Sequence, residues 1–192
     1  MKKGDLSGGK KLESYVVSKE ILGRGSFGVV CEATDRCTLE SLAVKVVGKI
    51  YGTLRDLNEF KKEAEILNSL SHSNILRFKG FFEDSINIYL FTERVTGGEL
   101  FSRIIEENGF EEEDAKIISR KIVSVIAYCH GKKVVHRDIK AENILFSSRS
   151  NDLDIRLIDF GFASRAEGMS LRGELGIIIT YSWHPHSPSH LA

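Results

Sequence analysis

The residues best suited to chemistry lie in the second half of the chain, between His136 and Gly161. Asp138 and Asn143 stand five positions apart, so that one loop carries a carboxylate and an amide. A general base needs a carboxylate, and a hard metal ion prefers oxygen ligands such as the amide oxygen. Asp159 follows an apolar run, opens an Asp-Phe-Gly sequence and supplies another hard ligand. The set predicts a general base beside a metal site, whereas the competing interpretation is a run of ordinary turn residues.

Glycines recur near the start of the chain in a Gly-x-Gly-x-x-Gly-x-Val pattern that runs from Gly23 to Val30. Glycine lets the backbone approach phosphate oxygens and offers N–H donors with no Cβ in the way. A dinucleotide-binding turn begins in a similar way, but there the third glycine opens a helix. Here the β-branched pair Val29 and Val30 follows Gly28, so the loop is predicted to join two strands. A plain hairpin turn and a cover over phosphates both remain open.

Lys45 lies inside the apolar run from Leu42 to Val47. A lysine in an apolar strand is costly unless its ammonium meets an anion. Glu63, beside the apolar stripe of a following helix, is the candidate anion. The alternatives are a lysine that snorkels from an edge strand, Lys49 in the place of Lys45, and a helix face that is simply charged and solvated.

The surrounding pattern predicts the elements that hold these residues. Up to residue 92, short β-branched runs predict a mostly antiparallel sheet with one amphipathic helix over residues 55–70. After the glycine pair at 97–98 the pattern becomes helical, and one apolar stripe marks a long helix. The stripe consists of Ala115, Ile118, Ile122, Val125, Ile126 and Cys129. The predicted strands cover residues 15–17, 20–22, 29–31, 42–47, 75–82 and 87–92, and short apolar runs follow at 134–135, 144–146 and 155–158.

Taken in order, the glycine-rich loop, the strand lysine, the helix glutamate, the His-Arg-Asp loop and Asp-Phe-Gly resemble those of the eukaryotic protein kinases. Lys140, two positions after Asp138, resembles the serine/threonine type. The segments 72–75 and 96–101 resemble the calcium/calmodulin-dependent and calcium-dependent branch. The resemblance implies an α+β, two-lobed fold over residues 15–192, with a β-rich N-lobe over 15–95 and a partial, helical C-lobe over 96–175.

The resemblance also implies ATP and Mg²⁺ as cofactors and a protein serine or threonine as substrate. Asp138 would orient or deprotonate the hydroxyl, and Lys140 would neutralise charge on the moving phosphoryl group. Lys45, held by Glu63, would bind the α- and β-phosphates. The residues expected to hold magnesium are Asn143 and Asp159. The residues expected to contact ATP are Leu22, Gly23, Arg24, Gly25, Ser26, Phe27, Gly28, Val29, Val30, Ala43, Lys45, Thr92, Glu93, Val95 and Glu99.

Two further features are implied by the same family. Arg137 would pair with a phosphate on the activation loop. Glu99 and Glu142 resemble carboxylates that attract basic residues upstream of the target hydroxyl. No EF-hand loop stands in this sequence, so any response to calcium would come from elsewhere.

The sequence departs from the family after Gly176, where no Ala-Pro-Glu follows. Residues 176–192 hold no Asp, Glu, Lys or Arg, but contain the only Trp and three of the six His. We therefore expect an aberrant tail there, a flexible segment over residues 1–14, and a long helix that lacks part of its partner surface. The pair His184-x-His186 is interpreted as tail rather than as metal ligands. The rival function is a catalytically silent nucleotide-binding or regulatory fragment.

Composition excludes several other classes. Apolar residues make up 42% and charged residues 28%, which predicts a packed core. Lys plus Arg and Asp plus Glu number 27 each, so no net field favours nucleic acid or an anionic membrane. No apolar run approaches the length of a membrane span, and no membrane partner is expected. Three cysteines without metal-ligand spacing, and a start without a secretory stretch, predict a reduced cytoplasmic protein.

Overall fold

The computed structural model describes residues 6–7, 9–25, 28–50, 52–150 and 153–166 of the 192-residue chain. Ser26 and Phe27 of the glycine-rich loop, and the tail predicted over 176–192, lie outside these residues. In the part of the chain that the structure describes, no helix combines the length and apolar character needed to cross a membrane.

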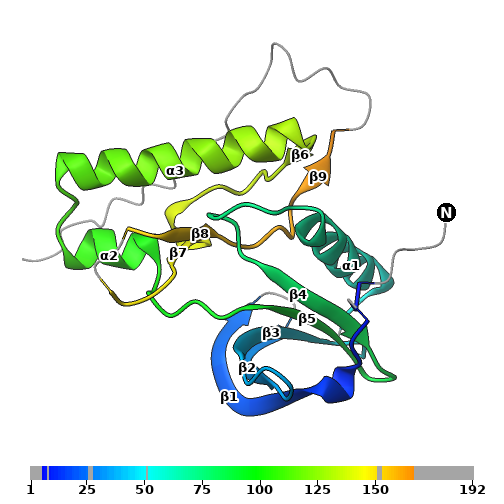
Figure 1. Cartoon of the computed structure of the whole chain (residues 1–192). Coiled ribbons are helices and arrows are strands. Elements are labelled where there is room, and N and C mark those ends of the chain that lie inside the picture. The colour runs from blue at the N-terminus through cyan, green and yellow to red at the C-terminus, as the bar shows by residue number, and fades with distance from the viewer. Residues whose placement is uncertain (1–5, 8, 26–27, 51, 151–152, 167–192) are drawn as a thin grey trace, which may run out of the picture.

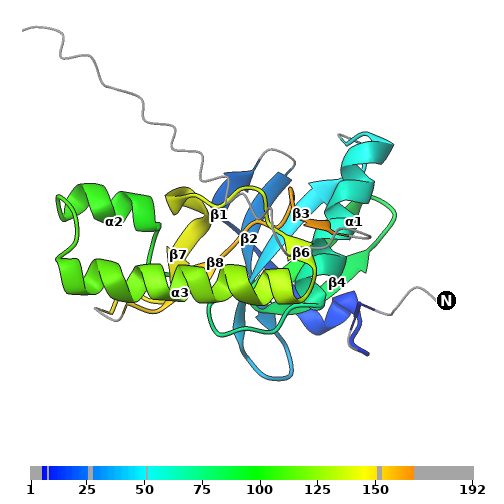
Figure 2. The ribbon, with the colours of Figure 1, turned by 90° about the horizontal axis from the view of Figure 1, so that it is seen from above.

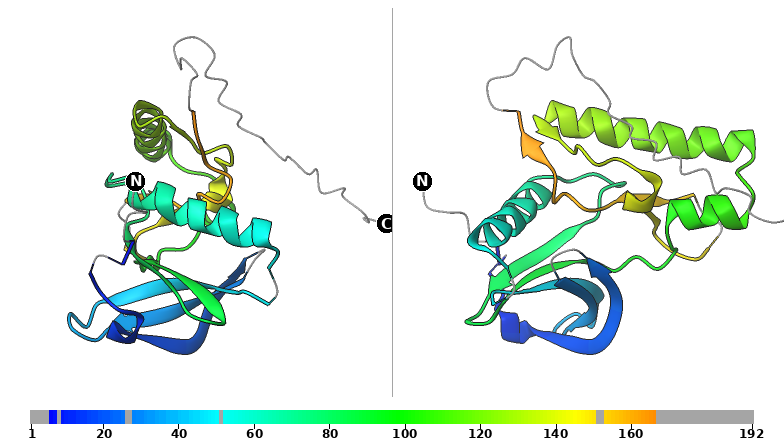
Figure 3. Two further views of the ribbon diagram at one scale, coloured as in Figure 1. Left: turned by 90° about the vertical axis from the view of Figure 1, so that its right-hand side faces the viewer. Right: turned by 180° about the vertical axis from the view of Figure 1, so that it is seen from behind.

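The N-lobe is a five-stranded antiparallel sheet with the strand order β1-β2-β3-β5-β4 (Figure 1). β-Branched and aromatic residues fill these strands, and such side chains suit a pleated, half-buried surface. The strands are β1 (Tyr15–Gly25), β2 (Gly28–Asp35), β3 (Ser41–Gly48), β4 (Phe78–Glu83) and β5 (Asn87–Glu93). The mostly antiparallel sheet is confirmed, and the runs 15–17 and 20–22, which the sequence predicts to form a strand that runs into the glycines, both lie in β1, with two register shifts against β2. The sheet is strongly curled (Figure 3).

Strand β4 begins at Phe78 and not at Ile75 as predicted, because the residues before it bind the other lobe. The Leu157 N–H donates to the Asn74 carbonyl at 2.8 Å, and the Leu76 N–H donates to the Leu157 carbonyl at 3.0 Å. An apolar run can therefore leave the sheet when its backbone groups find partners elsewhere.

Helix α1 (Leu54–Asn68) lies between the sheet and the C-lobe (Figure 1). It starts with a capping box, in which Thr53 and Asp56 satisfy each other's backbone N–H groups. Phe60 packs on the sheet side, and Leu67 packs into the apolar cluster of the C-lobe. The helix therefore touches both lobes.

The described part of the C-lobe combines two helices with two small antiparallel strand pairs, β6 with β9 and β7 with β8. Figure 2 shows α3 running alongside α2, with β7 and β8 beneath it. Two short 3₁₀ turns complete the described elements, η1 (Leu12–Ser14) and η2 (Ala141–Asn143). The C-lobe elements are α2 (Leu100–Glu106), α3 (Glu112–Gly131), β6 (Val134–Val135), β7 (Ile144–Phe146), β8 (Ile155–Leu157) and β9 (Ser164–Arg165).

The apolar stripe of α3 is better covered than the sequence suggested. Ile118, Val125 and Cys129 are each less than 5% exposed and belong to the same cluster as the buried residues of β6, β7 and β8. The prediction that the stripe lacks its partner surface is therefore wrong for these three residues. On other faces of the helix, Ile117 and Val123 are exposed.

Candidate active site between the two lobes

A cavity of about 390 Å³ lies between the lobes and is lined by both of them. Of the residues predicted to contact a nucleotide, ten line it. They are Leu22, Gly23, Arg24, Val30, Ala43, Lys45, Thr92, Glu93, Val95 and Glu99. Glu63 and Asp159 also reach the cavity wall. Residues separated by more than a hundred positions in the sequence are thus brought to one site.

Among the described residues, Gly28 and Val29 are predicted to contact the nucleotide but do not line the cavity, and several lining residues are not predicted. Val29 packs on the other face of the sheet, against the cluster around Tyr15, because successive side chains of a strand point to opposite faces. Sequence reasoning also missed an apolar part of the lining, which comes from strands and loops of both lobes. The missed residues include Leu76, Leu90, Leu145 and Ile158. The alternation of β5, in which Leu90 and Thr92 share a face, could have indicated Leu90.

Lys45 on β3 meets Glu63 on α1, with its Nζ 2.9 and 3.1 Å from the two carboxylate oxygens. Its ammonium also lies 5.1 Å from the centre of the Phe60 ring. Because β3 is flanked by β2 and β5, Lys45 is not an edge-strand lysine. The alternative residue, Lys49, pairs instead with Glu83 at 2.7 Å. Of the two lysines, Lys45 is therefore the one that pairs with Glu63.

Glu63 is buried, and its pKa is raised above the ordinary value. Burial raises the pKa of its carboxyl group, the charge and hydrogen bond of Lys45 oppose this rise, and nearby Asp159 adds to it. The negative charges of Glu63 and Asp159 therefore disfavour each other, and Lys45 does not offset the burial of Glu63. Such a site favours the arrival of further positive charge.

The glycine-rich loop joins β1 to β2, as the Val29–Val30 pair predicted, and Gly25 pairs with Gly28 at the end of the hairpin. A Cβ on Gly28 would lie 2.1 Å from the Val46 carbonyl oxygen on β3. No side chain fits there, so glycine at this position lets the start of β2 pass close to the backbone of β3.

Asp138 lies at the centre of a compact polar group in the loop after β6. The Asn143 amide Nδ2 donates to both the Oδ2 and the backbone carbonyl of Asp138, each at 2.8 Å. Lys140 Nζ lies 3.0 Å from the same Oδ2. The hydrogen bond with Asp138 raises the pKa of Lys140, so the ammonium stays charged. The spacing of five residues does bring the carboxylate and the amide together.

His136 connects this loop to the Asp-Phe-Gly segment. Its Nε2 lies 3.1 Å from the Ile158 carbonyl, and its Nδ1 lies 3.3 Å from the Asp138 N–H. The Phe160 ring packs edge-on against the imidazole, 4.7 Å between centres. Burial lowers the pKa of His136, which favours a neutral ring that donates through Nε2 and accepts through Nδ1. From the sequence, His136 is recognised only as part of the His-Arg-Asp motif, and no role is predicted for it.

Backbone strain marks both motifs. Arg137 and Asp159 have φ angles of 68° and 58°, in the left-handed region that non-glycine residues seldom adopt. Arg137 Nε donates to the Phe162 carbonyl at 2.6 Å, and the Gly161 N–H donates to Asp159 Oδ1 at 3.1 Å. Such residues persist where the surrounding contacts hold them, and they cluster at functional sites.

Comparison with known proteins agrees with this geometry. Residues 16–183 match the protein kinase domain family. The chain is 38% identical over 151 residues to calcium-dependent protein kinase 5 of Plasmodium berghei, covering 79% of this chain and 26% of that protein. It is 36% identical over 159 residues to a probable myosin light chain kinase of Dictyostelium discoideum, covering 83% and 45%.

A third relative is a calcium/calmodulin-dependent serine/threonine-protein kinase 1 of Oryza sativa, which is 41% identical over 155 residues, or 78% of this chain and 26% of the relative. The chain thus spans between about a quarter and a half of the length of these relatives.

Proposed function

Because the chain belongs to the protein kinase family, we propose that it transfers the γ-phosphoryl group of ATP to a serine or threonine hydroxyl of a protein. The observation that carries the proposal is the pairing of Lys45 with Glu63 in a cavity that also contains Asp159. The Ile158 N–H, one residue before Asp159, donates to the Asn143 carbonyl at 2.9 Å. This bond fixes the Asp138 loop beside the cavity.

ATP binding divides between an adenine end and a phosphate end. Apolar side chains above and below the cavity, such as Val30 and Leu145, enclose the base, and the backbone of residues 93–95 supplies its hydrogen-bonding groups. The Glu99 carboxylate accepts hydrogen bonds from the ribose hydroxyl groups. The N–H groups of the glycine-rich loop and the ammonium of Lys45 bind the phosphates.

The donor set fits Mg²⁺ held together with the nucleotide. Within the described residues, no group of three or more His, Cys, Asp or Glu could hold a metal ion alone. Mg²⁺ is usually bound by one or two protein ligands plus substrate phosphates, which suits Asn143 and Asp159. Asn143 uses its Nδ2 on Asp138, so its Oδ1 is the end that serves the cation. Bound Mg²⁺ neutralises charge on the phosphates.

Phosphoryl transfer needs little covalent help, so these residues act by positioning and charge. Asp138 orients the substrate hydroxyl and accepts its proton. Lys140, at 3.0 Å from Asp138, offsets negative charge on the transferred group. Exposed Glu99 and half-buried Glu142 favour peptides with basic residues before the target.

Replacing Asp138 by Asn tests the assignment. We expect phosphate incorporation from labelled Mg-ATP into a basic serine peptide to fall about 100- to 10,000-fold, because the base and orienter is lost. Binding of Mg-ATP, followed by thermal shift, should persist because Asp138 does not contact the nucleotide.

Undiminished incorporation in the Asp138→Asn variant would contradict the role of Asp138. A matched peptide with tyrosine in place of serine tests the hydroxyl class, and we expect little incorporation into it. If the unaltered chain binds Mg-ATP but transfers no phosphate, the silent nucleotide-binding fragment is the better description.

A further inference from the structure

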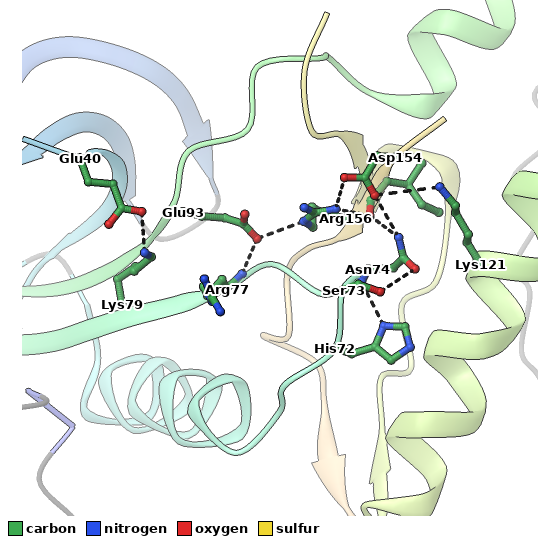
Figure 4. A network of polar contacts seen from close by, with 11 residues as sticks. Glu40, His72, Ser73, Asn74, Arg77, Lys79, Glu93, Lys121, Asp154 and Arg156 are labelled. Atoms are coloured by element: carbon green, nitrogen blue, oxygen red, sulfur yellow. Dashed lines mark hydrogen bonds and ion pairs between the residues drawn. The ribbon is translucent and has the colours of Figure 1, made fainter. Parts of the chain in front are cut away.

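Glu93, at the end of β5, forms part of the wall between two cavities. It lines the cavity between the lobes and also a second cavity of about 500 Å³ on the other side of the hinge, by which we mean residues 93–95, where the chain passes from one lobe to the other; Leu76 likewise lines both cavities. In the close-up, its carboxylate lies between Arg77 and Arg156 (Figure 4). Its Oε1 accepts from the Arg77 backbone N–H at 2.8 Å and from Arg156 Nε at 3.2 Å. The side chain of a predicted nucleotide-contacting residue is therefore held from behind.

Arg156, on β8, links Glu93 to the C-lobe. Its Nη1 lies 2.8 Å from Asp154 Oδ2. Asp154 is in turn 3.4 Å from Asn74 Nδ2 and 4.0 Å from Lys121 Nζ on α3. The contacts run from the hinge through β8 to the loop after α1 and to α3 (Figure 4).

The position of Arg156 suits a role beyond general stability. Its side chain is only 16% exposed and that of Glu93 only 23%, so solvent weakens their pairing less than it weakens a surface pair. Arginine presents a planar fork of donors, which lets one side chain bind Glu93 and Asp154 in fixed directions. Beyond Glu93 the chain crosses to the C-lobe, where the Thr96 N–H donates to the Ser147 carbonyl at 3.1 Å. The ion pair thus adds a side-chain connection where the backbone passes between lobes.

Resting on the proposed ATP-dependent function, we propose that Arg156 is a positioning residue for nucleotide binding. Through Glu93 it holds the hinge in the geometry that receives the base, without touching the nucleotide. A binding site that is already held in its bound geometry loses less free energy on binding. Loss of Arg156 should therefore weaken binding of the adenine end of the nucleotide and not of the phosphates, because the phosphate end depends on Lys45 and the glycine-rich loop.

The test uses the intact chain and three probes: Mg-ATP, adenosine and tripolyphosphate. Arg156→Met should weaken Mg-ATP and adenosine by about three- to tenfold and leave tripolyphosphate unchanged. Arg156→Lys should give an intermediate loss, because one ammonium keeps the charge but not the fork. Lys79→Met, which breaks the ion pair with Glu40 on the same side of the molecule, is the matched control and should leave all three affinities unchanged.

A double variant separates coupling from independent effects. If Arg156 acts through Glu93, Glu93→Gln combined with Arg156→Met should weaken adenosine little more than the stronger single variant. Additive losses, unchanged adenosine affinity in Arg156→Met, or an equal loss of tripolyphosphate would overturn the inference alone. Failure of the unaltered chain to bind Mg-ATP would instead overturn the proposed function and, with it, this inference.

Discussion

Two of the lysine–carboxylate pairs in the N-lobe have carboxylates that are almost fully buried but lie in different settings. Lys45 and Glu63 meet in the cleft between β3 and α1, whereas Lys10 and Asp35 meet where the N-terminal segment passes the end of β2. Both carboxylates are almost fully buried, with side chains 7% and 3% exposed. Their protonation equilibria nevertheless shift in opposite directions.

The buried charge of Asp35 is balanced by three hydrogen-bond donors. The Cys37 and Thr38 N–H groups donate to Oδ1 at 2.9 and 3.2 Å, and Lys10 donates to Oδ2. Together, Lys10 first and then the backbone donors lower the pKa of Asp35 to about 2. This is the pattern of an aspartate that closes a turn, here between β2 and β3.

Glu63 has a raised pKa because the ion pair with Lys45 does not make up for burial, and Asp159 adds negative charge. The comparison teaches that burial of a charge does not by itself identify a functional residue. A structural carboxylate has enough donors of its own, whereas a carboxylate in a binding site is left with charge that a ligand or cation can complete.

The lysines give the largest expected contrast. Lys45→Met should weaken Mg-ATP at least about tenfold, since a charged hydrogen bond to phosphate is lost. The unfolding temperature should change little, because Glu63 can take up a proton. Lys10→Met should leave nucleotide binding unchanged but lower the unfolding temperature. Thermal-shift titration measures both quantities, and equal nucleotide responses in the two variants would refute the assignment of Lys45.

The carboxylates give a smaller contrast, in stability. Asp35→Asn removes a charge that has three donors and should lower the unfolding temperature by a few degrees. Glu63→Gln removes a charge that burial penalises, and Lys45, 23% exposed, keeps access to water. We therefore expect its unfolding temperature to stay the same or to rise. Calorimetry of both variants at pH 7 measures the two unfolding temperatures. A larger decrease for Glu63→Gln than for Asp35→Asn would contradict the expected order.

The sequence could predict the pairing of Lys45 with Glu63 but not the contacts that join Glu93 to Arg156 and Asp154. Lys45 in an apolar strand and Glu63 beside a helix stripe are local anomalies, and each calls for a partner. Arg156 and Glu93 are ordinary charged residues 63 positions apart, and their pairing depends on how the two lobes meet. The strand order was within reach of local patterns, because antiparallel neighbours follow one another along most of the sheet. The face taken by Val29 required the register of β1 and β2.

The pH dependence of stability is the finest test of the same comparison. The pKa of Asp35 falls from its ordinary value of 3.8 to about 2, so its stabilising effect is present above pH 3.8 and is lost as the pH falls through 2. Glu63 has a raised pKa, so its contribution is greatest below its ordinary value of 4.5 and declines as the pH rises through the folded-state value. Lowering the pH from 7 to 3 should therefore reduce the amount by which the free energy of unfolding of the unaltered chain exceeds that of Asp35→Asn. The same change should raise the free energy of unfolding of the unaltered chain relative to that of Glu63→Gln. Urea midpoints at four pH values measure both differences. Slopes of the same sign would show that the two carboxylates are not compensated in the opposite ways that their contacts indicate.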